Sequence, residues 1–266
     1  MIGALFFPNI TRPEDSRLSS SFKAHYTDLL TGMEFVFVKG GCFAMGDTFG
    51  DGYFAEHPVH EVCVDNFYMG KYEVTQGQWA VFMGREPSCP GRGEHFPAGC
   101  VNYADVQTFM ARLSQATGKK FRLPTEAEWE YACRSGGKRE RYAGFSEKDR
   151  IFRYANFCDV NCNYDWATGD HDDGHKDAAP AGSFLPNDLG LYDMSGNVWE
   201  WVADWFDEGY YEKSPRYNPK GPQFGQQRLV RGGCWLNSPN YLRCSYRFGF
   251  NPALREHDIG FRVVME

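Results

Sequence analysis

Oxygen-bearing side chains gather around a tight turn in one segment of the sequence and could bind a hard cation. In the segment DMSGNVWEW, Asp193 and Glu200 bracket Gly196 and Asn197. Calcium takes several oxygen ligands, in which carboxylates combine with backbone carbonyls. The residue types therefore predict a calcium site at this turn. In the alternative interpretation, Asp193 and Glu200 cap the turn and pair with arginines such as Arg231.

A second group of carboxylates lies in the segment NYDWATGDHDDGHKDAAPAG. This segment is too polar and too rich in glycine to pack unaided. The carboxylates of Asp170, Asp172 and Asp177 repel one another unless a cation or solvent screens them. Both a cation site and a solvated acidic loop remain open.

The cysteines are the residues that could support redox or soft-metal chemistry. There are 9 of them, an odd number, so at least one thiol is free or pairs between chains. Cys158 and Cys162, like Cys89 and Cys100, lack the spacing of a zinc site and are expected to be disulfides or simple thiols. The histidines are not arranged as HxxxH on any expected helix, which gives a non-haem iron site little support. No Ser/His/Asp order or nucleotide-binding fingerprint stands out.

Composition narrows the classes of partner. A net charge of -7 without a run of Lys or Arg argues against nucleic acid and anionic membranes and fits cationic ligands or metals. No apolar run reaches the roughly 20 residues of a membrane span, and the first residues are too weakly apolar for a signal peptide. We therefore expect no membrane span and, by default, a cytoplasmic protein. The 17% aromatic content and 29 glycines favour short strands and tight turns.

Three helices are expected to position these side chains. Apolar residues at i, i+3, i+4 and i+7 predict a helix over residues 103–117, with Gly118 as its stop. Thr75 is placed to cap a shorter helix. Thr125 and Glu128 have the spacing of a capping box at the start of a third.

Short strands are expected between these helices. Two apolar runs around residues 40–41 predict a hairpin with a glycine turn, and NVWEWVADWF, RLVRGGCW and IGFRVV predict later strands. Residues 1–30 carry few periodic signals and are interpreted as an N-terminal arm. Residues 31–266 are expected to form one domain, because no internal repeat or low-complexity linker divides them.

Four segments, in this order, resemble the sulfatase-modifying-factor family, which includes the formylglycine-generating enzymes. They are GGCFAMGD, RLPTEAEWEYACRSGG, GLYDMSGNVWEWVADWF, and RGGCW followed by IGFRVV. The resemblance implies an α+β, C-type-lectin-like fold, in which short twisted antiparallel strands and a few helices carry long irregular loops. It also places a ligand-binding segment at residues 231–264.

The resemblance implies two calcium sites that combine side-chain oxygens with backbone carbonyls. Phe157 and His175 would contribute only carbonyls. The matching residues are Asn156, Phe157, Asp173 and His175 for one site, and Asp193, Gly196, Val198 and Glu200 for the other.

Enzymes of this family use two cysteines shortly after an RGGS motif to bind copper(I) and oxidise a substrate cysteine to formylglycine. In RGGCWLNSPNYLRCSYR these positions fall on Asn237 and near Leu242, neither of which is a thiol. Cys234 and Cys244 lie nearby but are displaced from the pattern. A copper-dependent formylglycine-generating oxidoreductase is therefore the alternative function, and buried structural cysteines are the simpler interpretation.

The residues between RGGCW and IGFRVV mix aromatic, aliphatic and charged types, and part of them is expected to pack in the core. The arrangement also resembles the variable proteins of diversity-generating retroelements, which display a hypervariable C-terminal surface on the same fold. We therefore expect a non-catalytic, calcium-stabilised domain that binds a protein or small-molecule target. The expected binding residues are Trp235, Leu236, Asn237, Ser238, Asn240, Tyr241, Phe248, Gly249, Phe250, Asn251, Leu254, Arg255, Glu256, His257 and Asp258.

Overall fold

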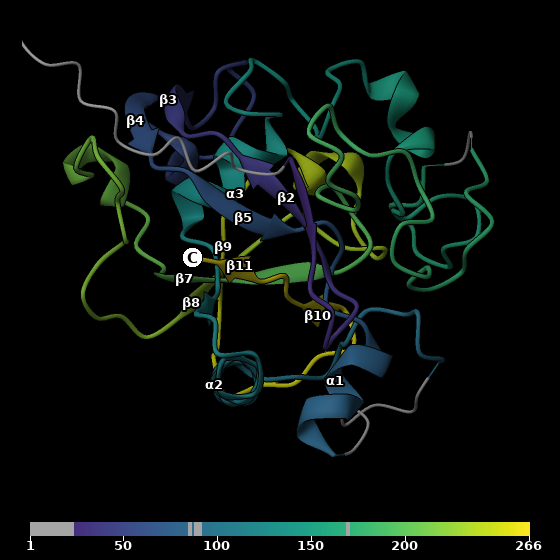
Figure 1. Ribbon diagram of the computed structural model, residues 1–266. Coiled ribbons are helices and arrows are strands. Elements are labelled where there is room, and N and C mark those ends of the chain that lie inside the picture. Colours follow the sequence, from purple (N-terminus) through teal and green to yellow (C-terminus); the bar gives the residue numbers. More distant parts are fainter. Residues whose placement is uncertain (1–23, 85–86, 88–91, 169–170) are drawn as a thin grey trace, which may run out of the picture.

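Short strands dominate the computed structural model, which describes residues 24–84, 87, 92–168 and 171–266 (Figure 1). The first sheet has the order β1 (His25–Thr27), β2 (Glu34–Val38), β5 (Phe67–Gly70), β11 (Val264–Met265), β6 (Phe121–Arg122). The second has the order β10 (Ile259–Gly260), β7 (Trp199–Trp205), β8 (Arg228–Arg231), β9 (Phe248–Phe250), and the third pairs β3 (Gly41–Met45) with β4 (His60–Val64). The strands pair antiparallel, apart from the parallel pair of β7 and β10.

The three expected helices are confirmed as α1 (Gln76–Met83), α2 (Tyr103–Thr117) and α3 (Glu126–Cys133). The side chains of Thr75, Asn102 and Thr125 each accept a backbone N–H of the first turn, so all three helices begin with a capping box. Gly84 and Gly118 end the first two helices in the left-handed conformation. Single-turn helices η1 (Phe54–Glu56), η2 (Lys148–Arg153), η3 (Tyr210–Lys213) and η4 (Pro239–Leu242) interrupt the loops.

The predicted hairpin at Gly40 is wrong. Strands β2 and β3 pair with β5 and β4 in one continuous antiparallel register, in which Val38 lies opposite Phe67 and Gly41 opposite Val64. The glycines therefore form a bend inside a long two-stranded ribbon. A Cβ on Gly40 would lie 2.3 Å from the Val64 carbonyl oxygen, so only glycine allows the two strands to approach at the bend.

Helices α1 and α2 lie next to each other below the sheets in Figure 1, whereas α3 packs among β3, β4, β7 and β8. The predicted apolar face of α2 is buried: Phe109 is fully buried and stacks on Trp79 of α1 at 5.5 Å between ring centroids. Both rings also contact Phe261, which follows β10. The two helices therefore seal one side of the core against the C-terminal strands.

Residues 24–30, expected in the N-terminal arm, include β1, which pairs with β2. Residues 1–23, Cys89 and Asp170 lie outside the described part of the chain. Among the described helices, none combines the length and the apolar character that crossing a membrane requires.

Asp204 in β7 is a buried acid whose pKa makes the stability of the fold depend on pH. Asp204 accepts the backbone N–H of Glu126, the first residue of α3, at 2.8 Å. Burial, together with the nearby Glu126 carboxylate, raises the pKa of Asp204 from 3.8 to about 8. The folded state therefore keeps a proton that the unfolded chain releases, so the stability from this group is present at low pH and is lost as pH rises toward 8.

We expect Asp204→Asn to flatten the pH dependence of the free energy of unfolding between about pH 5 and 8. One such group contributes a slope of up to ~1.4 kcal/mol per pH unit, and asparagine keeps the hydrogen-bond acceptor. Urea unfolding at several pH values measures the slope, with the exposed Glu208→Gln as the matched control. Equal slopes in the wild type and the Asp204 variant would contradict the assignment.

Candidate ligand-binding site

A cavity of about 370 Å³ opens where β7, β9 and β10 meet the loop around η4. Aromatic side chains dominate it, and Asp258 and Asn237 supply its polar groups. The residues that line it are Trp199, Asn237, Tyr241, Tyr246, Phe248, Phe250, Asp258 and Ile259. Five of these belong to the predicted binding set, because Asn237, Tyr241, Phe248, Phe250 and Asp258 converge here.

The aromatic rings of the cavity contact one another in an unbroken series. Tyr241 and Tyr246 have ring centroids 5.0 Å apart, and Tyr246 lies 5.8 Å from Trp199. Trp199 in turn lies 5.7 Å from Phe248, which lies 6.3 Å from Phe250. Trp199 is buried whereas Phe248 is 41% exposed, so the series runs from the core to the surface. Mutual packing of this kind holds each ring in place before any ligand binds.

Cys234 lies beneath the polar side of the cavity. Its sulfur lies 3.1 Å from Asn237 Oδ1 and 3.4 Å from Asp258 Oδ2, and Asn237 Oδ1 also accepts the Cys234 backbone N–H at 3.0 Å. Burial, together with the Asp258 carboxylate, raises the pKa of the Cys234 thiol well above its usual range. The thiol therefore stays protonated, so its single S–H can donate to Asp258 while the backbone N–H holds Asn237.

Buried ion pairs fix the backbone that carries these residues. Arg243 binds both oxygens of Glu56, and Arg247 binds both oxygens of Glu126 at 2.6 and 2.9 Å. The chain turns at Gly233, where a Cβ would lie 2.9 Å from the Tyr241 carbonyl oxygen. Glycine there lets η4 fold back over the cavity.

The remaining predicted binding residues lie around the cavity or away from it. Gly249 is buried against Phe206, and the buried Trp235 contacts the ring of His257 at 5.6 Å. Arg255 pairs with Asp105 near the start of α2. The others lie at least partly at the surface: Leu236, Ser238, Asn240, Asn251, Leu254, Glu256 and His257.

Three lining residues were not in the predicted set: Trp199, Tyr246 and Ile259. Trp199 belongs to the segment interpreted as a cation-binding turn and a strand, and Ile259 begins the strand IGFRVV. Strand alternation places Trp199 and Trp201 on the same face, which could have indicated an aromatic surface. The position of Tyr246 depends on the irregular chain between η4 and β9 and has no local signal.

The residues predicted for one calcium site come together around Asn156. The backbone N–H of Phe157 donates to Asp173 Oδ2 at 3.4 Å, and that of His175 donates to Asp173 Oδ1 at 2.8 Å. Asn156 Oδ1 is buried and has no hydrogen-bond partner, which is costly unless something binds it. Burial, with a contribution from Asp159, raises the pKa of Asp173 to about 7. A buried oxygen without a partner and the raised pKa of the Asp173 carboxyl fit a hard cation.

Asp159 was not among the predicted ligands. It is fully buried, and its Oδ2 accepts the backbone N–H of Asp173 at 2.6 Å. Nothing in a polar sequence such as CDVNC indicates that its carboxylate will be buried.

The turn at residues 193–200 carries two buried carboxylates, Asp193 and Glu200, which lie with a third, Glu73, around a single arginine. The two carboxylate oxygens of Glu200 accept hydrogen bonds from Nε and Nη2 of Arg262 at 2.7 and 2.6 Å, so its arginine partner is Arg262 and not Arg231. Asp193 Oδ2 accepts the Gly182 N–H, whereas its Oδ1 is buried without a partner. Burial, with a smaller contribution from Glu200, raises the pKa of Asp193 to about 6.

Glu73, which precedes α1, is the third carboxylate of this cluster. Burial and the charges of Asp193 and Glu200 raise its pKa well above its usual range. Its oxygens accept Asn197 Nδ2 at 2.6 Å and the Val198 N–H at 3.2 Å. Three carboxylates facing one guanidinium leave excess negative charge, so this donor set also fits a cation.

The two predicted cation sites share one backbone contact. The Asn197 N–H donates to the Asn156 carbonyl at 2.9 Å, and a Cβ on Gly196 would lie 2.2 Å from that oxygen. Only glycine therefore permits the turn to pack against Asn156. The geometry of one predicted site is thereby linked to the geometry of the other.

Comparisons with known proteins agree with this arrangement. The family model described as "Sulfatase-modifying factor enzyme 1-like domain" matches residues 23–266. The chain belongs to the sulfatase-modifying-factor family. A formylglycine-generating enzyme of Streptomyces coelicolor is 33% identical, over 85% of this chain and 87% of that protein. The serine/threonine-protein kinase pkn1 of Chlamydia caviae is 32% identical over 87% of this chain, which spans 38% of the kinase.

Solved structures confirm the expected C-type-lectin-like fold of this sulfatase-modifying-factor domain. Treponema denticola variable protein 1 has a TM-score of 0.76 and 25% identity, and covers 91% of this chain and 98% of its own. PvdO from Pseudomonas aeruginosa also has a TM-score of 0.76, with 29% identity over 91% of this chain and 97% of its own.

In this family member, the two displaced cysteines do not form a thiol pair. Cys244 forms a disulfide with Cys133, 111 residues earlier in the chain, while Cys234 remains a buried free thiol. Cys42–Cys63 and Cys158–Cys162 are further disulfides, and Cys100 is also disulfide-bonded. A near-linear copper(I) site needs two thiolates, and this segment supplies only one protonated thiol.

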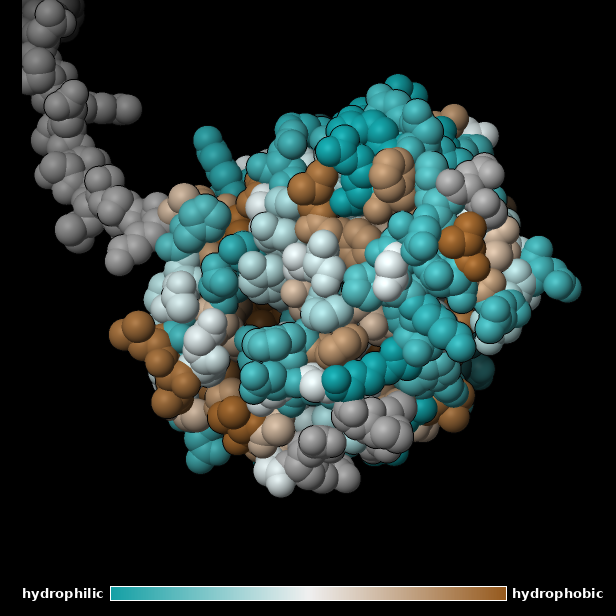
Figure 2. Space-filling model, turned by 90° about the vertical axis from the view of Figure 1, so that its right-hand side faces the viewer, coloured by the Kyte–Doolittle hydropathy of each residue, from teal (hydrophilic) through white to brown (hydrophobic). Residues whose placement is uncertain are grey.

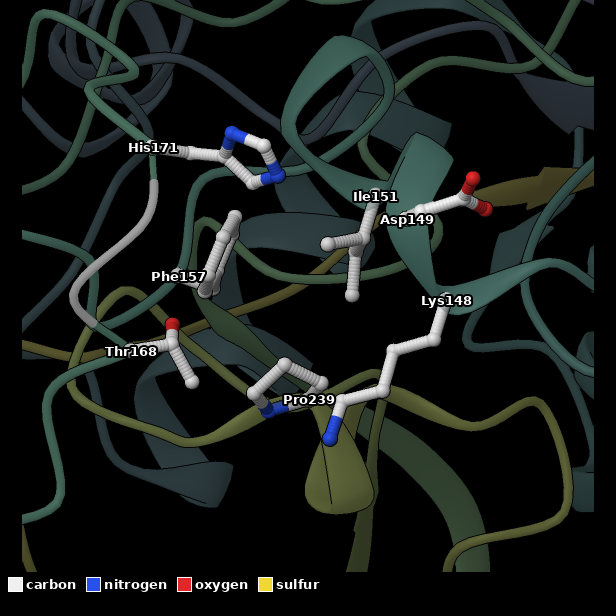
Figure 3. Close-up of a pocket in the computed structure, with 7 residues that line it drawn as sticks. All are labelled: Lys148, Asp149, Ile151, Phe157, Thr168, His171 and Pro239. Carbon is white, nitrogen blue, oxygen red and sulfur yellow. The ribbon is translucent and has the colours of Figure 1, made fainter.

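A second cavity of about 320 Å³ lies between η2 and the acidic loop (Figure 3). Phe157 and Ile151 form its apolar side, His171 and Thr168 come from the loop, and Lys148 extends toward Pro239.

Figure 2, which views the molecule from the right-hand side of Figure 1, shows a mostly hydrophilic face with hydrophobic groups in separate small areas.

The cysteine arrangement predicts a defined pattern of chemical reactivity. Without reduction, peptide mapping should recover Cys133 linked to Cys244, because the disulfide joins α3 to the segment after η4. In the native protein, iodoacetamide should leave Cys234 unmodified, since the thiol is buried and protonated, and should label it after denaturation. Rapid labelling of native Cys234, or a link between Cys234 and Cys244, would contradict this assignment.

Proposed function

We propose that this sulfatase-modifying-factor domain is a non-catalytic binding module that holds its target at the aromatic cavity. The observation that supports this most directly is the disulfide between Cys244 and Cys133, which leaves Cys244 without a thiol that could bind copper. The cavity of about 370 Å³ is lined by five aromatic side chains. The positions of the family's catalytic cysteines fall on Asn237 and near Leu242. Asn237 lines the cavity, so a binding residue stands where a copper ligand would be needed.

The chemistry of the cavity supports binding. Rigid aromatic residues contribute large contact areas at low entropic cost and dominate binding hot spots. Phe248 and Tyr241 are accessible at the mouth, while Arg243 and Arg247 hold the surrounding backbone through buried ion pairs. A fixed scaffold with accessible aromatic positions would tolerate changes at the binding positions without unfolding.

The similarity to Treponema denticola variable protein 1 supports a variable C-terminal surface of the diversity-generating-retroelement type. The partly exposed residues around the cavity, from Leu236 to Asp258, are the positions that would vary. The target would then be a protein or a small molecule chosen by these side chains.

Calcium is proposed as the structural cofactor. Asn156 Oδ1 and Asp193 Oδ1 are buried oxygens without partners, and the pKa values of Asp173 at the first site and Asp193 at the second are raised. At the first site Asn156 and Asp173 would hold the ion with the carbonyls of Phe157 and His175. At the second, Asp193 and Glu200 would act with the carbonyls of Gly196 and Val198. The bound ion would supply charge neutralisation and would order the loops.

Formylglycine generation with copper(I) remains the alternative function, because the Streptomyces coelicolor relative bears that name. It is not favoured, since it requires two accessible thiols and only Cys234 is free in the described part of the chain.

A fluorine-NMR fragment screen on the full chain tests the binding function. Fragments that bind the cavity should lose their line broadening in Phe248→Ala, because this exposed ring forms the mouth. Phe224→Ala removes another exposed phenylalanine, 83% accessible, and should leave binding unchanged. If the two variants reduced the line broadening equally, or if Phe248→Ala left the line broadening of every fragment unchanged, the result would contradict binding at this cavity.

The same preparation is loaded with copper(I) and incubated with oxygen and a cysteine-containing sulfatase-motif peptide. Mass spectrometry should show an unchanged peptide, whereas the Streptomyces coelicolor enzyme should convert it to the aldehyde. Conversion by this protein would establish the alternative function and overturn the proposal.

Calcium is expected to raise the melting temperature relative to EDTA. Saturation at 100 times Kd corresponds to ~2.7 kcal/mol, or roughly 5 to 10 °C for a domain of this size. Asp193→Asn should reduce the shift while keeping the acceptor for Gly182, and the exposed Asp165→Asn should not. Scanning calorimetry of the three proteins measures it, and equal melting temperatures with and without calcium would refute the calcium proposal.

The calcium effect should also grow with pH. The pKa values of Asp193 and Asp173, raised from 3.8 to about 6 and about 7, mean that the calcium-free fold keeps protons that the unfolded chain releases. Without calcium, stability is therefore lost as pH rises through this range. A bound ion keeps the carboxylates charged and should remove this loss.

A further inference from the structure

The aromatic cavity has the electrostatic character of a cation-binding site. Aromatic rings carry negative charge on their faces and attract cations within about 6 Å of the ring centre. Burial raises the pKa of the Tyr246 hydroxyl, so this ring stays neutral. Trp199, the strongest cation-binding ring type, lies between Tyr246 and Phe248 in the series of ring contacts.

A carboxylate group adds formal negative charge to one wall. Asp258 is half-buried and lines the cavity, and its side-chain oxygen lies within 4.8 Å of ligand atoms of Glu256 and His257. Its hydrogen bond comes from the neutral Cys234 thiol, which donates without neutralising the charge. The cavity thus combines aromatic rings with a carboxylate whose charge no lysine or arginine of the lining neutralises.

The arginines of the C-terminal segment are all engaged elsewhere. Arg231 pairs with Glu130 and Arg243 with Glu56. Arg247 pairs with Glu126 and Arg255 with Asp105. Arg262 pairs with Glu200 below the second calcium site. No lysine or arginine lines the cavity within the described part of the chain, so its negative character is not cancelled from inside.

These features favour an organic cation over a metal ion, an anion or a neutral apolar group as the ligand. A metal ion needs several oxygen or nitrogen ligands around it, and Asp258 could supply them only together with Glu256 and His257, which do not line the cavity. An anion would face Asp258 without a cationic partner. A neutral apolar group would fill the ring-lined space but would leave the carboxylate desolvated and unpaired, which costs free energy.

We propose that the cavity recognises an alkylammonium group, either a quaternary ammonium of the choline type or the side chain of lysine, between its aromatic rings and Asp258. This inference rests on the proposed binding function and names the chemistry of the ligand. The net charge of -7 would assist by attracting cations to the surface.

Isothermal titration of the full chain in calcium-containing buffer tests the proposal with three probes. Choline represents a small quaternary ammonium, and N-acetyl-lysine methylamide represents a protein side chain. The third probe, 3,3-dimethylbutan-1-ol, has the shape of choline without its charge. We expect choline or the lysine probe to bind at least ~10-fold more tightly than the alcohol, and the tighter of the two cations identifies the source of the ligand.

Two variants test the groups that create the site. Phe248→Leu keeps an apolar side chain but removes the ring, and Asp258→Asn keeps the shape but removes the charge. Each should weaken binding of the preferred cation by about 3- to 30-fold. Phe224→Leu, at an exposed ring elsewhere, should have no effect. Circular dichroism of each variant confirms that it is folded.

The failure of this inference can be told apart from failure of the proposed function. Equal affinity for choline and the alcohol, unchanged cation binding in Asp258→Asn, or no binding of either cation at millimolar concentration would each overturn the alkylammonium assignment. Fragment binding that depends on Phe248 would then still support a binding module. Conversion of the sulfatase-motif peptide to an aldehyde would instead overturn the proposed function itself.

Discussion

Buried contacts between carboxylates and guanidinium groups connect α3 to β8 and to the chain before β9. Glu130 binds Arg134 at 3.0 Å and Arg231 at 2.6 Å, and Glu126 binds Arg247. Every residue of α3 is buried, so these charges lie away from water. A buried charge that loses its partner is strongly destabilising. The helix, β8 and the chain before β9 are therefore held in one arrangement.

This constraint determines what the surface can do. Because Arg243 and Arg247 are anchored in the interior, the chain that carries Tyr246 and Phe248 is held in place and presents these two rings to the cavity. The same use of arginine leaves Asp258 without a cationic partner among the described residues. The internal ion pairs and the negative character of the cavity thus have a common origin in how the chain distributes its positive charges.

The acidic clusters near the loops pose a different physical problem. Glu73, Asp193 and Glu200 face one arginine, and Asp173 lies against the buried Asp159. Excess buried negative charge can be relieved by protonation or by a bound cation, and the raised pKa values describe the first solution. Asn156 Oδ1 and Asp193 Oδ1, which have no hydrogen-bond partner, favour the second. Since Asn156 also contacts the turn at Gly196, the state of these clusters bears on how the loop between η2 and β7 is ordered.

The three helices and the family could be predicted from the amino-acid sequence. Helix boundaries followed from apolar periodicity and from caps at Thr75 and Thr125, because these depend on residues three or four apart. The four family segments identified the fold, since their order spans nearly the whole chain. The aromatic character of Tyr241 and Phe248 was likewise evident without coordinates.

Contacts between residues far apart in the chain could not be predicted in this way. The tertiary structure paired Cys244 with Cys133, gave Glu200 the guanidinium of Arg262 instead of Arg231, and placed Trp199 beside Tyr246 in the cavity. It also turned Gly40 from an expected hairpin turn into a bend within a longer ribbon. These contacts join segments far apart in the chain, and the path of the backbone through irregular loops sets them. Local patterns of residue type carry no record of that path.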